Sequence, residues 1–525
     1  MFLRHPLPLT RILALALSLA AVLISYLVAD RIFEQMPHIE DEWAYNWQAQ
    51  VLAAGRFSTV SPPYPESLLV PFVVDHNGQR FGKYPPGWPL VLAIGVRFGL
   101  RSWVNPVLAG LGIWLIYILG RRLFDERTGL LAAALALTSP FFQLNSASLL
   151  SHPLGLVLSA AFTLSWLDVS ATPGRSVARR WLAAGIAGVC LGWLALTRPL
   201  TAVGLAIPFA GHGLWLLWRA DWPTRRRLLL VAGLAAGMGS LLFWWQYTVT
   251  GSPFTNPYTL WWPYDKIGFG PGVGVKPGGH TLSQGWFNTQ VNLAAASFDL
   301  FGWGPISWIL LPFGVLAARR SRPAWLAGAS FVSLVIVYMA YWIGAQLFGP
   351  RYYYEALPAL AIFSAAGAFW LAGAAQDPQA GAPSPAGRAG ERFLCYRRLA
   401  VVALLTFLVA INLVFYLPIR LEGMRNLYTI NRTALQPFQT PAAQALTPAL
   451  VIVHSDRWMS YGNLLELEDT FLGSPFIFAW SLTDDMDRAI AALYPNRTIL
   501  HYYTDEPGRF YHAPRPTPTD GPSKD

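Results

Sequence analysis

Three adjacent acidic residues, Glu40, Asp41 and Glu42, follow shortly after the first long apolar run of the chain. Carboxylates are costly to desolvate, so at the mouth of a membrane segment they lie in water or in a cavity that uses them. In a partly dry site, a carboxylate can accept the proton of an attacking hydroxyl group. We therefore predict that Asp41 acts as a general base, with Glu42 as its orienting neighbour or substitute. The alternative is a solvated acidic loop that keeps this end of the chain out of the membrane.

A lysine follows in the same hydrophilic region, next to a rigid turn. Lys83 and Tyr84 belong to the motif Gly-Lys-Tyr-Pro-Pro-Gly-Trp at 82–88. An interfacial lysine beside such a turn can neutralise the charge on a departing phosphate oxygen. The motif predicts that Lys83 and Tyr84 bind the phosphate of a lipid. The alternative is a lysine that only reaches over the lipid headgroups.

Two arginines and a histidine elsewhere in the chain are candidates for the same phosphate site. Arg351 and Tyr352 open a late helix, where the guanidinium group can bind phosphate through two hydrogen bonds, helped by the positive start of the helix. Alternatively, Arg351 pairs with Glu355 one turn later. Arg198 and His152 lie at turns on the same predicted side. Either both residues join the phosphate site, or Arg198 only marks the turn of a helical hairpin and His152 only forms structural hydrogen bonds.

The composition excludes an ordinary soluble protein. The 525 residues are 54% hydrophobic and 13% charged, whereas roughly 25% are charged in a typical soluble domain. We predict an integral membrane protein. The formal net charge of +10 comes from arginine clusters between apolar runs, which orient spans and meet anionic lipid, so nucleic acid is not an expected partner. Cys190 and Cys395 have no metal-ligand spacing, so no zinc site, disulfide or cofactor is predicted, and a divalent ion is left open.

The elements that must position the candidate residues are transmembrane helices, each of which needs about 20 mostly apolar residues. The segment 85–100 is short, interrupted by Gly and Pro, and carries Arg97, which favours a helix that lies at the interface or dips into the membrane. The first long segment is predicted to be a retained helix rather than a cleaved signal peptide. Eleven segments are predicted to span: 12–29, 103–120, 129–146, 153–170, 181–197, 199–218, 228–247, 303–318, 324–343, 352–374 and 399–418.

The distribution of basic residues predicts the orientation. If 85–100 does not cross, the loops on one side hold seventeen basic residues: Arg121, Arg122, Arg127, Arg175, Arg179, Arg180, Arg219, Arg225, Arg226, Arg227, Arg319, Arg320, Arg322, Arg388, Arg392, Arg397 and Arg398. After residue 121, the loops on the other side hold only Arg198, Lys266, Lys276 and Arg351. Because the basic-rich side is cytoplasmic, Asp41 and the other candidates face outside. We expect a multi-pass protein of the plasma (cell inner) membrane with a cytoplasmic N-terminus.

Two domains are predicted. Residues 1–418 form the transmembrane domain, with outer loops 30–102 and 248–302, and residues 419–525 form a small extracytoplasmic α/β domain that ends in a disordered tail. Strands at 449–454, 475–480 and 498–503 and a helix at 484–494 make up this second domain. The Ala-, Gly- and Pro-rich stretch 377–390 is predicted to be a cytoplasmic linker.

The two outer loops differ in their expected structure. The first contains a predicted surface helix at 43–55, whose Trp43, Trp47 and Val51 recur at helical spacing beside polar residues, as at a membrane interface. The second is rich in Gly, Pro and aromatic residues and is predicted to be an ordered loop or lid. Its charged residues either bind an acceptor or are simply solvated: Asp265, Lys266, His280 and Asp299.

The order of four motifs resembles that of the GT-C glycosyltransferases. The motifs are Asp41-Glu42-Trp43-Ala44-Tyr45, Lys83-Tyr84-Pro85-Pro86, Gly120-Arg121-Arg122-Leu123-Phe124 and Ala136-Leu137-Thr138-Ser139-Pro140. Within these enzymes the chain looks like the branch that holds protein O-mannosyltransferases and lipid A aminoarabinose transferases, over roughly residues 10–375. One departure is Tyr84, which separates Lys83 from the proline pair, where aminoarabinose transferases have Lys-Pro-Pro. The outer C-terminal region has no counterpart that would identify the acceptor.

The resemblance implies an activity. In that family the outer-loop Asp is the base that activates the acceptor and the sugar comes from a polyprenyl phosphate, so the same roles are expected for Asp41 and for the lipid here. We expect a polytopic, mainly α-helical glycosyltransferase that transfers a hexose or pentose to a protein, glycan or lipid acceptor on the outer face. Within enzymes, the alternative is an arabinosyl- or phosphosugar-lipid transferase. From other classes, the alternatives are a transporter or lipid-translocating protein and a scaffold that binds through its C-terminal domain.

Overall fold

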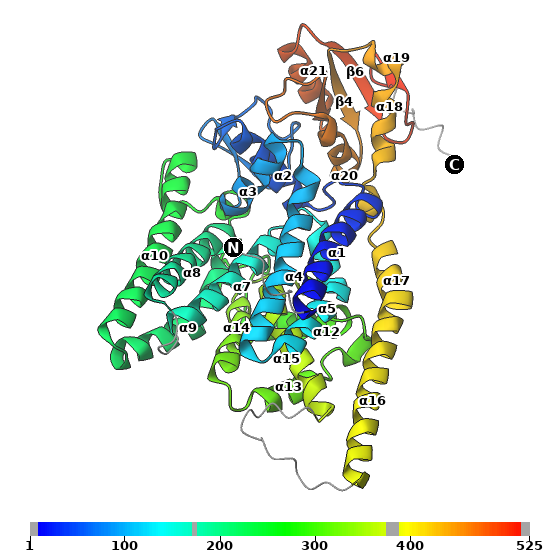
Figure 1. Ribbon diagram of the computed structural model, residues 1–525. Helices are drawn as coiled ribbons and strands as arrows, with labels where there is room; N and C mark the ends of the chain where they lie inside the picture. The colour runs from blue at the N-terminus through cyan, green and yellow to red at the C-terminus, as the bar shows by residue number, and fades with distance from the viewer. Residues whose placement is uncertain (1–8, 171–175, 374–387, 516–525) are drawn as a thin grey trace, which may run out of the picture.

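The apolar segments form a bundle of long helices, and a sheet built by the C-terminal region lies at one end of it (Figure 1). The structure, a computed structural model, describes residues 9–170, 176–373 and 388–515. Arg175, the predicted linker up to residue 387 and most of the predicted disordered tail lie outside the described residues.

Eight helical segments of the described residues are long and apolar enough to cross a membrane, or up to ten if each of two bent pairs is one span. The eight are α1 (Leu9–Arg31), η1 with α4 (Arg101–Leu123), α7 (His152–Val169), α8 (Val177–Thr197), α9 (Pro199–Arg219), α10 (Trp222–Thr250), η3 with α15 (Arg351–Leu371) and the segment Glu391–Gln439, which contains most of α16 (Arg388–Ile411). A shorter apolar helix, α14 (Arg322–Tyr338), occupies most of another predicted span. The predicted multi-pass, mainly α-helical fold is confirmed.

The predicted span 129–146 needs correction, because it is not a straight helix. α5 (Glu126–Thr138) and α6 (Pro140–Ala147) meet at an angle of 64°. Pro140 lacks a backbone N–H group and drives the preceding residue out of the helical conformation. Ser139 accordingly has an extended backbone, and its side chain accepts a hydrogen bond from the N–H group of Phe142, which starts the second helix.

The segment 85–100 contains a helix that is too short to span. α3 (Gly87–Arg97) has 11 residues, which correspond to about 16 Å, against about 30 Å for the hydrocarbon core of a bilayer. It begins in close contact with the end of α8, since a Cβ atom on Gly87 would lie 2.6 Å from the carbonyl oxygen of Leu196. This length supports the orientation in which the segment does not cross.

The first outer loop is more buried than its sequence indicates. The sequence predicted a surface helix at the membrane interface here, and this prediction is wrong for α2 (Glu40–Ala53). Its Trp43, Trp47 and Val51 are buried in one hydrophobic cluster with Phe476 and Phe478 of the C-terminal sheet. The face expected to meet lipid therefore packs against the C-terminal region. A small antiparallel sheet completes the loop: β1 (Thr59–Val60), β2 (Val73–His76) and β3 (Gln79–Gly82) in the order β1-β3-β2.

The second outer region contains two helices that its composition does not indicate. They are α11 (Pro257–Trp261) and α12 (Leu282–Asp299). α12 begins with a capping box, in which Thr281 and Gln284 satisfy each other's backbone N–H groups. α12 is followed by a bend of 102° into the segment Gly304–Ala318, which contains α13 (Leu311–Ala318). The predicted span 303–318 therefore also needs correction, because α13 has only 8 residues and the segment could span only together with α12.

The C-terminal region forms the predicted α/β structure. Its sheet has the strand order β5-β4-β6-β7, with β4 parallel to β5 and β6, and β7 antiparallel to β6. The elements are β4 (Ala449–His454), β5 (Phe476–Trp480), α21 (Asp484–Leu493), β6 (Thr498–Tyr503) and β7 (Phe510–Tyr511). The predicted strands and helix are confirmed, whereas the domain boundary after residue 418 and the side of the membrane stay predictions.

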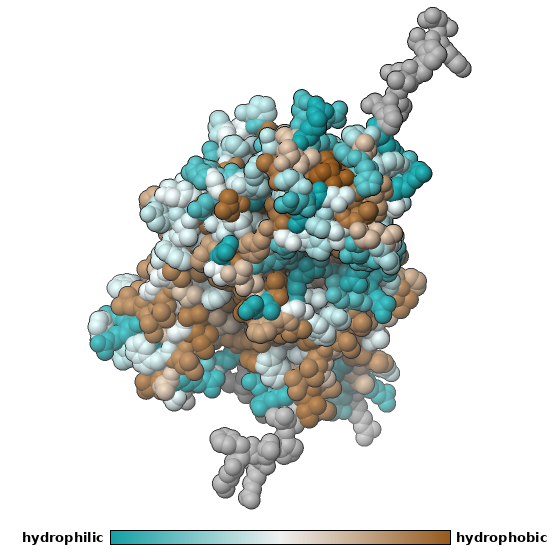
Figure 2. All heavy atoms as spheres, turned by 90° about the horizontal axis from the view of Figure 1, so that it is seen from above, coloured by the Kyte–Doolittle hydropathy of each residue, from teal (hydrophilic) through white to brown (hydrophobic). Residues whose placement is uncertain are grey.

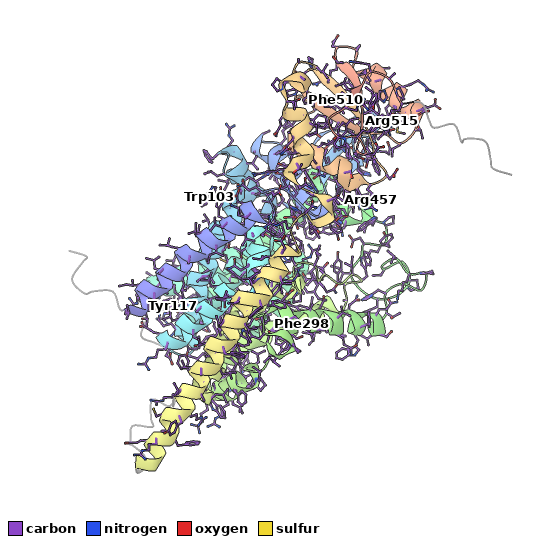
Figure 3. All side chains as sticks on the ribbon, turned by 90° about the vertical axis from the view of Figure 1, so that its right-hand side faces the viewer. Trp103, Tyr117, Phe298, Arg457, Phe510 and Arg515 are labelled. Carbon is purple, nitrogen blue, oxygen red and sulfur yellow. The ribbon has the colours of Figure 1, made fainter. Side chains whose placement is uncertain are left out.

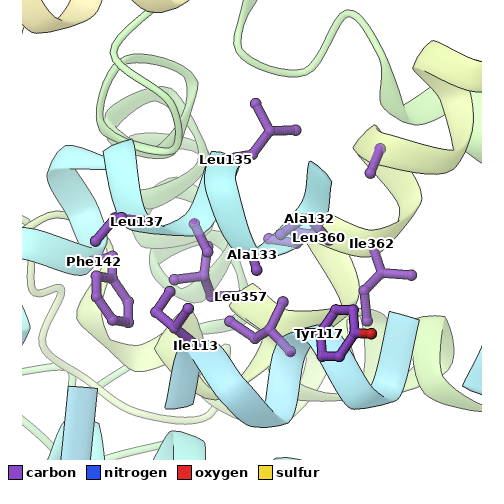
Figure 4. Close-up of a cluster of buried hydrophobic side chains, with 14 of the residues drawn as sticks. Ile113, Tyr117, Ala132, Ala133, Leu135, Leu137, Phe142, Leu357, Leu360 and Ile362 are labelled. Atoms are coloured by element: carbon purple, nitrogen blue, oxygen red, sulfur yellow. The ribbon is translucent and has the colours of Figure 1, made fainter. Parts of the chain in front are cut away.

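The central core of the bundle joins α4, α5 and α15 (Figure 4). Ile113 and Tyr117 of α4, Ala133 of α5 and Leu357 of α15 are all fully buried in it. Small residues allow close approach of the helices, as in other membrane bundles. A Cβ atom on Gly120 would lie 2.6 Å from the Cα atom of Gly129, so the α4–α5 crossing requires glycine.

The arginine clusters lie at the helix ends opposite to the candidate residues. α8 carries Arg179 near its start and ends just before Arg198, α10 carries Arg225 near its start, and α14 begins with Arg322. The other ends of these helices point towards the end of the molecule that carries the C-terminal sheet (Figure 1), where Figure 3 labels Phe510 of β7. Viewed from that end, hydrophilic side chains gather over the C-terminal region and hydrophobic ones lie more to the sides (Figure 2). The structure thus has one basic end and one end that carries the outer regions.

Candidate active site

A cavity of about 700 Å³ lies among the helix ends nearest the C-terminal sheet. α7, α8, α9, α10 and α14 contribute residues near one of their ends, and both outer loops contribute the rest. Seven of the eight predicted site residues line it: Asp41, Lys83, Tyr84, His152, Arg198, Arg351 and Tyr352. Residues that are more than three hundred positions apart in the sequence are thereby brought together.

Asp41 lies in this cavity between a tyrosine and an arginine. The Tyr84 hydroxyl group donates a hydrogen bond of 2.5 Å to its Oδ1 atom, and both terminal nitrogens of Arg351 lie 3.3 Å from its Oδ2 atom. Burial raises the pKa of Asp41, but the Arg351 charge and the Tyr84 hydrogen bond outweigh it and hold the pKa below its usual value. Asp41 is therefore a charged carboxylate at neutral pH.

Lys83 occupies an aromatic cage inside the same cavity. Its ammonium group lies 3.5 Å from the ring centre of Phe72, 4.8 Å from that of Trp262, and 3.5 Å from the Oδ2 atom of Asp265. Such rings attract a cation through their negative faces. Burial lowers the pKa of Lys83, and the charges of Asp265 and Asp41 oppose this effect. The alternative of a lysine that reaches over headgroups does not fit a side chain that is only 3% exposed.

Arg198 and His152 share a buried carboxylate. The Nε atom of Arg198 lies 3.0 Å from Oε1 of Glu355, and the Nδ1 atom of His152 lies 3.7 Å from the same oxygen. Glu355 thus pairs with Arg198 and not with Arg351, which excludes the alternative partner considered for Arg351. A Cβ atom on Gly155 would lie 2.4 Å from this oxygen, so the carboxylate fits only because residue 155 is glycine.

Glu42 does not join the cavity. Its side chain turns into the protein, where its carboxylate accepts hydrogen bonds from the backbone N–H groups of Leu149 at 2.7 Å, His38 at 2.9 Å and Ile39 at 3.3 Å. Burial raises the pKa of Glu42 to about 7, although these hydrogen bonds oppose the rise. The structure therefore places Glu42 as a buried anchor for the start of α2, away from the acid-base position predicted for it.

Two further acids of the cavity, Asp265 and Glu40, were noted in the sequence but were not assigned to the catalytic or phosphate-binding set. Asp265 accepts hydrogen bonds from the Tyr341 hydroxyl group at 3.1 Å and the Trp342 indole at 3.0 Å, in addition to its contact with Lys83. Glu40 also lines the cavity. Asp265 could not be distinguished from other loop charges because its partners lie in distant segments. Glu40 was a member of the acidic triplet, but helical spacing alone does not decide which of three adjacent acids face one cavity.

Of the other charged candidates in the second outer region, one lines the cavity and two do not. Lys266 lines the cavity, whereas His280 contacts the carbonyl oxygen of Met339 at 2.9 Å outside it. The Oδ1 atom of Asp299 lies 3.1 Å from the Nε atom of Arg420, and this ion pair links the end of α12 to the segment after α16. Within 9–170, 176–373 and 388–515, no group of three or more His, Cys, Asp or Glu side chains is arranged to hold a metal ion.

The sequence and the fold of this chain are similar to those of known proteins. The model of the family described as dolichyl-phosphate-mannose-protein mannosyltransferase matches residues 88–245. ArnT from Cupriavidus metallidurans bound to undecaprenyl phosphate is similar with a TM-score of 0.57 and 16% identity, over 94% of this chain and 90% of ArnT. Its apo structure has a TM-score of 0.56 and 17% identity, over 94% and 89%. No curated protein matches the sequence.

A third structure extends the likeness. The apo oligosaccharyltransferase from Archaeoglobus fulgidus has a TM-score of 0.50 and 16% identity, over 88% of this chain and 64% of that protein. At these identities the similarity concerns the fold. The resemblance found in the sequence is confirmed: the chain has the GT-C fold of membrane glycosyltransferases of the ArnT and protein mannosyltransferase type.

Proposed function

We propose that this protein transfers a sugar from a polyprenyl-phosphate donor to an acceptor on the outer face of the membrane, with Asp41 as the base. One observation carries the proposal: Asp41, Lys83 and Arg351 line one cavity although they come from three distant parts of the sequence. ArnT, whose fold is similar, has been crystallised with undecaprenyl phosphate. The chemistry of the cavity suits such a donor, since the departing phosphate requires cations and the attacking hydroxyl group requires a base.

The donor phosphate is expected to take over Arg351. Carboxylate and phosphate both accept the paired N–H groups of a guanidinium group, so the two compete for it. Once the phosphate holds Arg351, the Oδ2 atom of Asp41 loses the partners that lie 3.3 Å away. The loss of the positive charge raises the basicity of Asp41. Donor binding thus makes Asp41 a stronger base, whereas Arg351 keeps the basicity of Asp41 low while the site holds no phosphate.

The transfer itself balances with these residues alone. The acceptor oxygen forms a bond to the anomeric carbon of the sugar as the bond from that carbon to the phosphate oxygen breaks. Asp41 receives the acceptor proton, and the electron pair of the broken bond leaves with the phosphate, next to Arg351 and Lys83. Lys83 shares its charge between the phosphate and Asp265, while Tyr84, Tyr352, Arg198 and His152 shape and polarise the surrounding pocket.

The orientation supports an outer-face acceptor. The cavity lies at the helix ends opposite to Arg179, Arg225 and Arg322, and basic clusters mark the cytoplasmic side of membrane proteins. The cavity and the C-terminal sheet then face the outside of the cell inner membrane. The sugar is a hexose or pentose, and the acceptor is a protein, glycan or lipid that reaches this face.

A donor-binding comparison tests the proposal. Full-length protein in liposomes is given radiolabelled undecaprenyl-phosphate hexoses and pentoses together with a cell-envelope fraction as acceptor. Wild-type protein should label the acceptor with at least one donor, and Lys83→Ala should weaken undecaprenyl phosphate binding. Lys276→Ala removes an exposed lysine of the second outer region and should leave binding unchanged. Equal binding by both variants, or failure to label with any donor, contradicts the proposal.

A further inference from the structure

Three carboxylates line the cavity, and two of them are held by cations. Arg351 lies 3.3 Å from Asp41, and Lys83 lies 3.5 Å from Asp265. The third carboxylate, Glu40, forms no ion pair with any residue that the structure describes, and its hydrogen-bond donor is its own backbone N–H group. A cavity-lining acid that no cation holds is available to a substrate, to water or to a proton.

Glu40 also has a suitable position. It is the first residue of α2 and adjoins Asp41 in the sequence. The positive end of a helix tolerates a carboxylate in this position, so Glu40 can be charged without a cation partner. Glu40 is half-buried and lines the cavity, so part of its surface is open to the water that fills the cavity.

The proposed reaction creates a need for such a group. Asp41 becomes neutral when it takes the acceptor proton, and a neutral carboxyl group no longer forms an ion pair with Arg351. The resting site, with both residues charged and paired, returns only after Asp41 loses this proton. The proton therefore requires a route from Asp41 to water.

We propose that Glu40 is a proton-relay residue, which takes the proton from Asp41 after each transfer and passes it to solvent. The inference rests on the proposed function. In this step one O–H bond of Asp41 breaks and one O–H bond of Glu40 forms, and no other bond changes. Glu40 acts through Asp41, and its contact with solvent completes the path.

The electrostatics favour this direction of transfer. Burial raises the pKa of Glu40; its own backbone N–H group opposes the rise, the Asp41 charge adds to it, and the charges of Arg351 and Lys83 oppose it. The net pKa of Glu40 is raised, whereas that of Asp41 is lowered by Arg351 and Tyr84 despite its burial. Once the phosphate has left and Arg351 acts on Asp41 again, a proton on Asp41 therefore moves to Glu40 with a decrease in free energy.

Rescue by small acids and bases distinguishes a relay from a structural role. With the same liposomes and labelled undecaprenyl-phosphate sugars, Glu40→Gln should lower kcat by about tenfold or more in dilute buffer. Added formate, acetate or imidazole should restore the rate, because these molecules carry protons to and from Asp41. The KM for the donor should not change. Glu40→Asp should retain most of the activity, and Glu66→Gln, which alters an exposed acid of the same outer loop, should behave as the wild type.

The outcomes separate this inference from the proposed function. Normal kcat for Glu40→Gln in dilute buffer overturns the relay, and so does a loss of activity that small acids and bases do not relieve. In either case transfer by the wild type and its loss in Asp41→Asn still support the transferase. If Asp41→Asn transfers normally, the base assignment fails and the relay fails with it.

Discussion

Arg351 forms its ion pair with Asp41, 310 residues away in the sequence, and not with Glu355 in its own helical segment. Glu355 instead pairs with Arg198. This exchange of partners directs both arginines towards one cavity, because each is held by a carboxylate from another part of the chain. A local pair between Arg351 and Glu355 would have left Asp41 without a cation and the cavity without a defined phosphate site.

Removal of Arg351 should affect donor binding and the base together. Arg351→Gln loses the paired N–H groups, so we expect undecaprenyl phosphate affinity to fall by about 10- to 100-fold. The pKa of Asp41 should rise, since the Arg351 charge lowers it, and the pH below which transfer is lost should rise with it. Binding titrations and pH profiles in liposomes measure both effects. Arg101→Gln breaks an arginine pair with Glu466 outside the cavity and is the control; equal behaviour of the two variants would contradict the account.

A single methyl group should disturb the Arg198 cluster. Gly155→Ala places a Cβ atom 2.4 Å from Oε1 of Glu355, so the carboxylate must move away from Arg198 and His152. We expect kcat to fall by about tenfold, because small displacements of positioned charges are costly to catalysis. Gly185→Ala, at a helical glycine with open space around it, should retain activity. If both alanine variants are equally active, Glu355 does not position the cluster.

Glu42 should make stability depend on pH. In the unfolded chain its pKa is about 4.3, whereas in the folded protein burial raises it to about 7. Between these values the folded state binds more protons, so stability falls as pH rises, by about 4 kcal/mol in total. Glu42→Gln lacks this titration. The Tm of the wild type should therefore fall relative to that of Glu42→Gln from pH 5 to pH 8, and a constant difference would contradict the assignment.

Cysteine labelling should reveal the orientation. Cys190 is buried and Cys395 is exposed, so Cys395→Ser provides a quiet background. In intact cells, a membrane-impermeant thiol reagent should label Ser460→Cys in the C-terminal region and should not label Arg122→Cys at the end of α4 until the membrane is permeabilised. The reverse pattern would place the cavity on the cytoplasmic side.

Much of the bundle could be predicted because transmembrane helices obey a strong length and hydropathy rule. The same rule cannot detect a break inside an apolar segment, so it missed the bend at Pro140. Nor can it detect a helix of mixed composition, so it missed α12. It also cannot tell lipid from protein as the partner of an apolar face. Trp43 and Trp47 therefore suited a membrane interface in the sequence, whereas in the structure they pack against the C-terminal sheet.

The site could be predicted in its residue types but not in its pairs. Asp41, Lys83, Arg198 and Arg351 were identifiable because charged residues near apolar spans are rare and require a reason. Their partners were not, since Asp265 reaches Lys83 only through the fold of the second outer region. Which of the adjacent acids Glu40, Asp41 and Glu42 line the cavity also could not be predicted, because it depends on how α2 packs.

The central claim is that Asp41 takes the proton of the acceptor, and Asp41→Asn tests it most directly. Transfer of labelled sugar from an undecaprenyl-phosphate donor and binding of undecaprenyl phosphate are measured on the same liposomes. The account predicts that the amide variant binds the lipid and loses transfer by roughly 10²- to 10⁴-fold. Transfer by Asp41→Asn at the wild-type rate would contradict it.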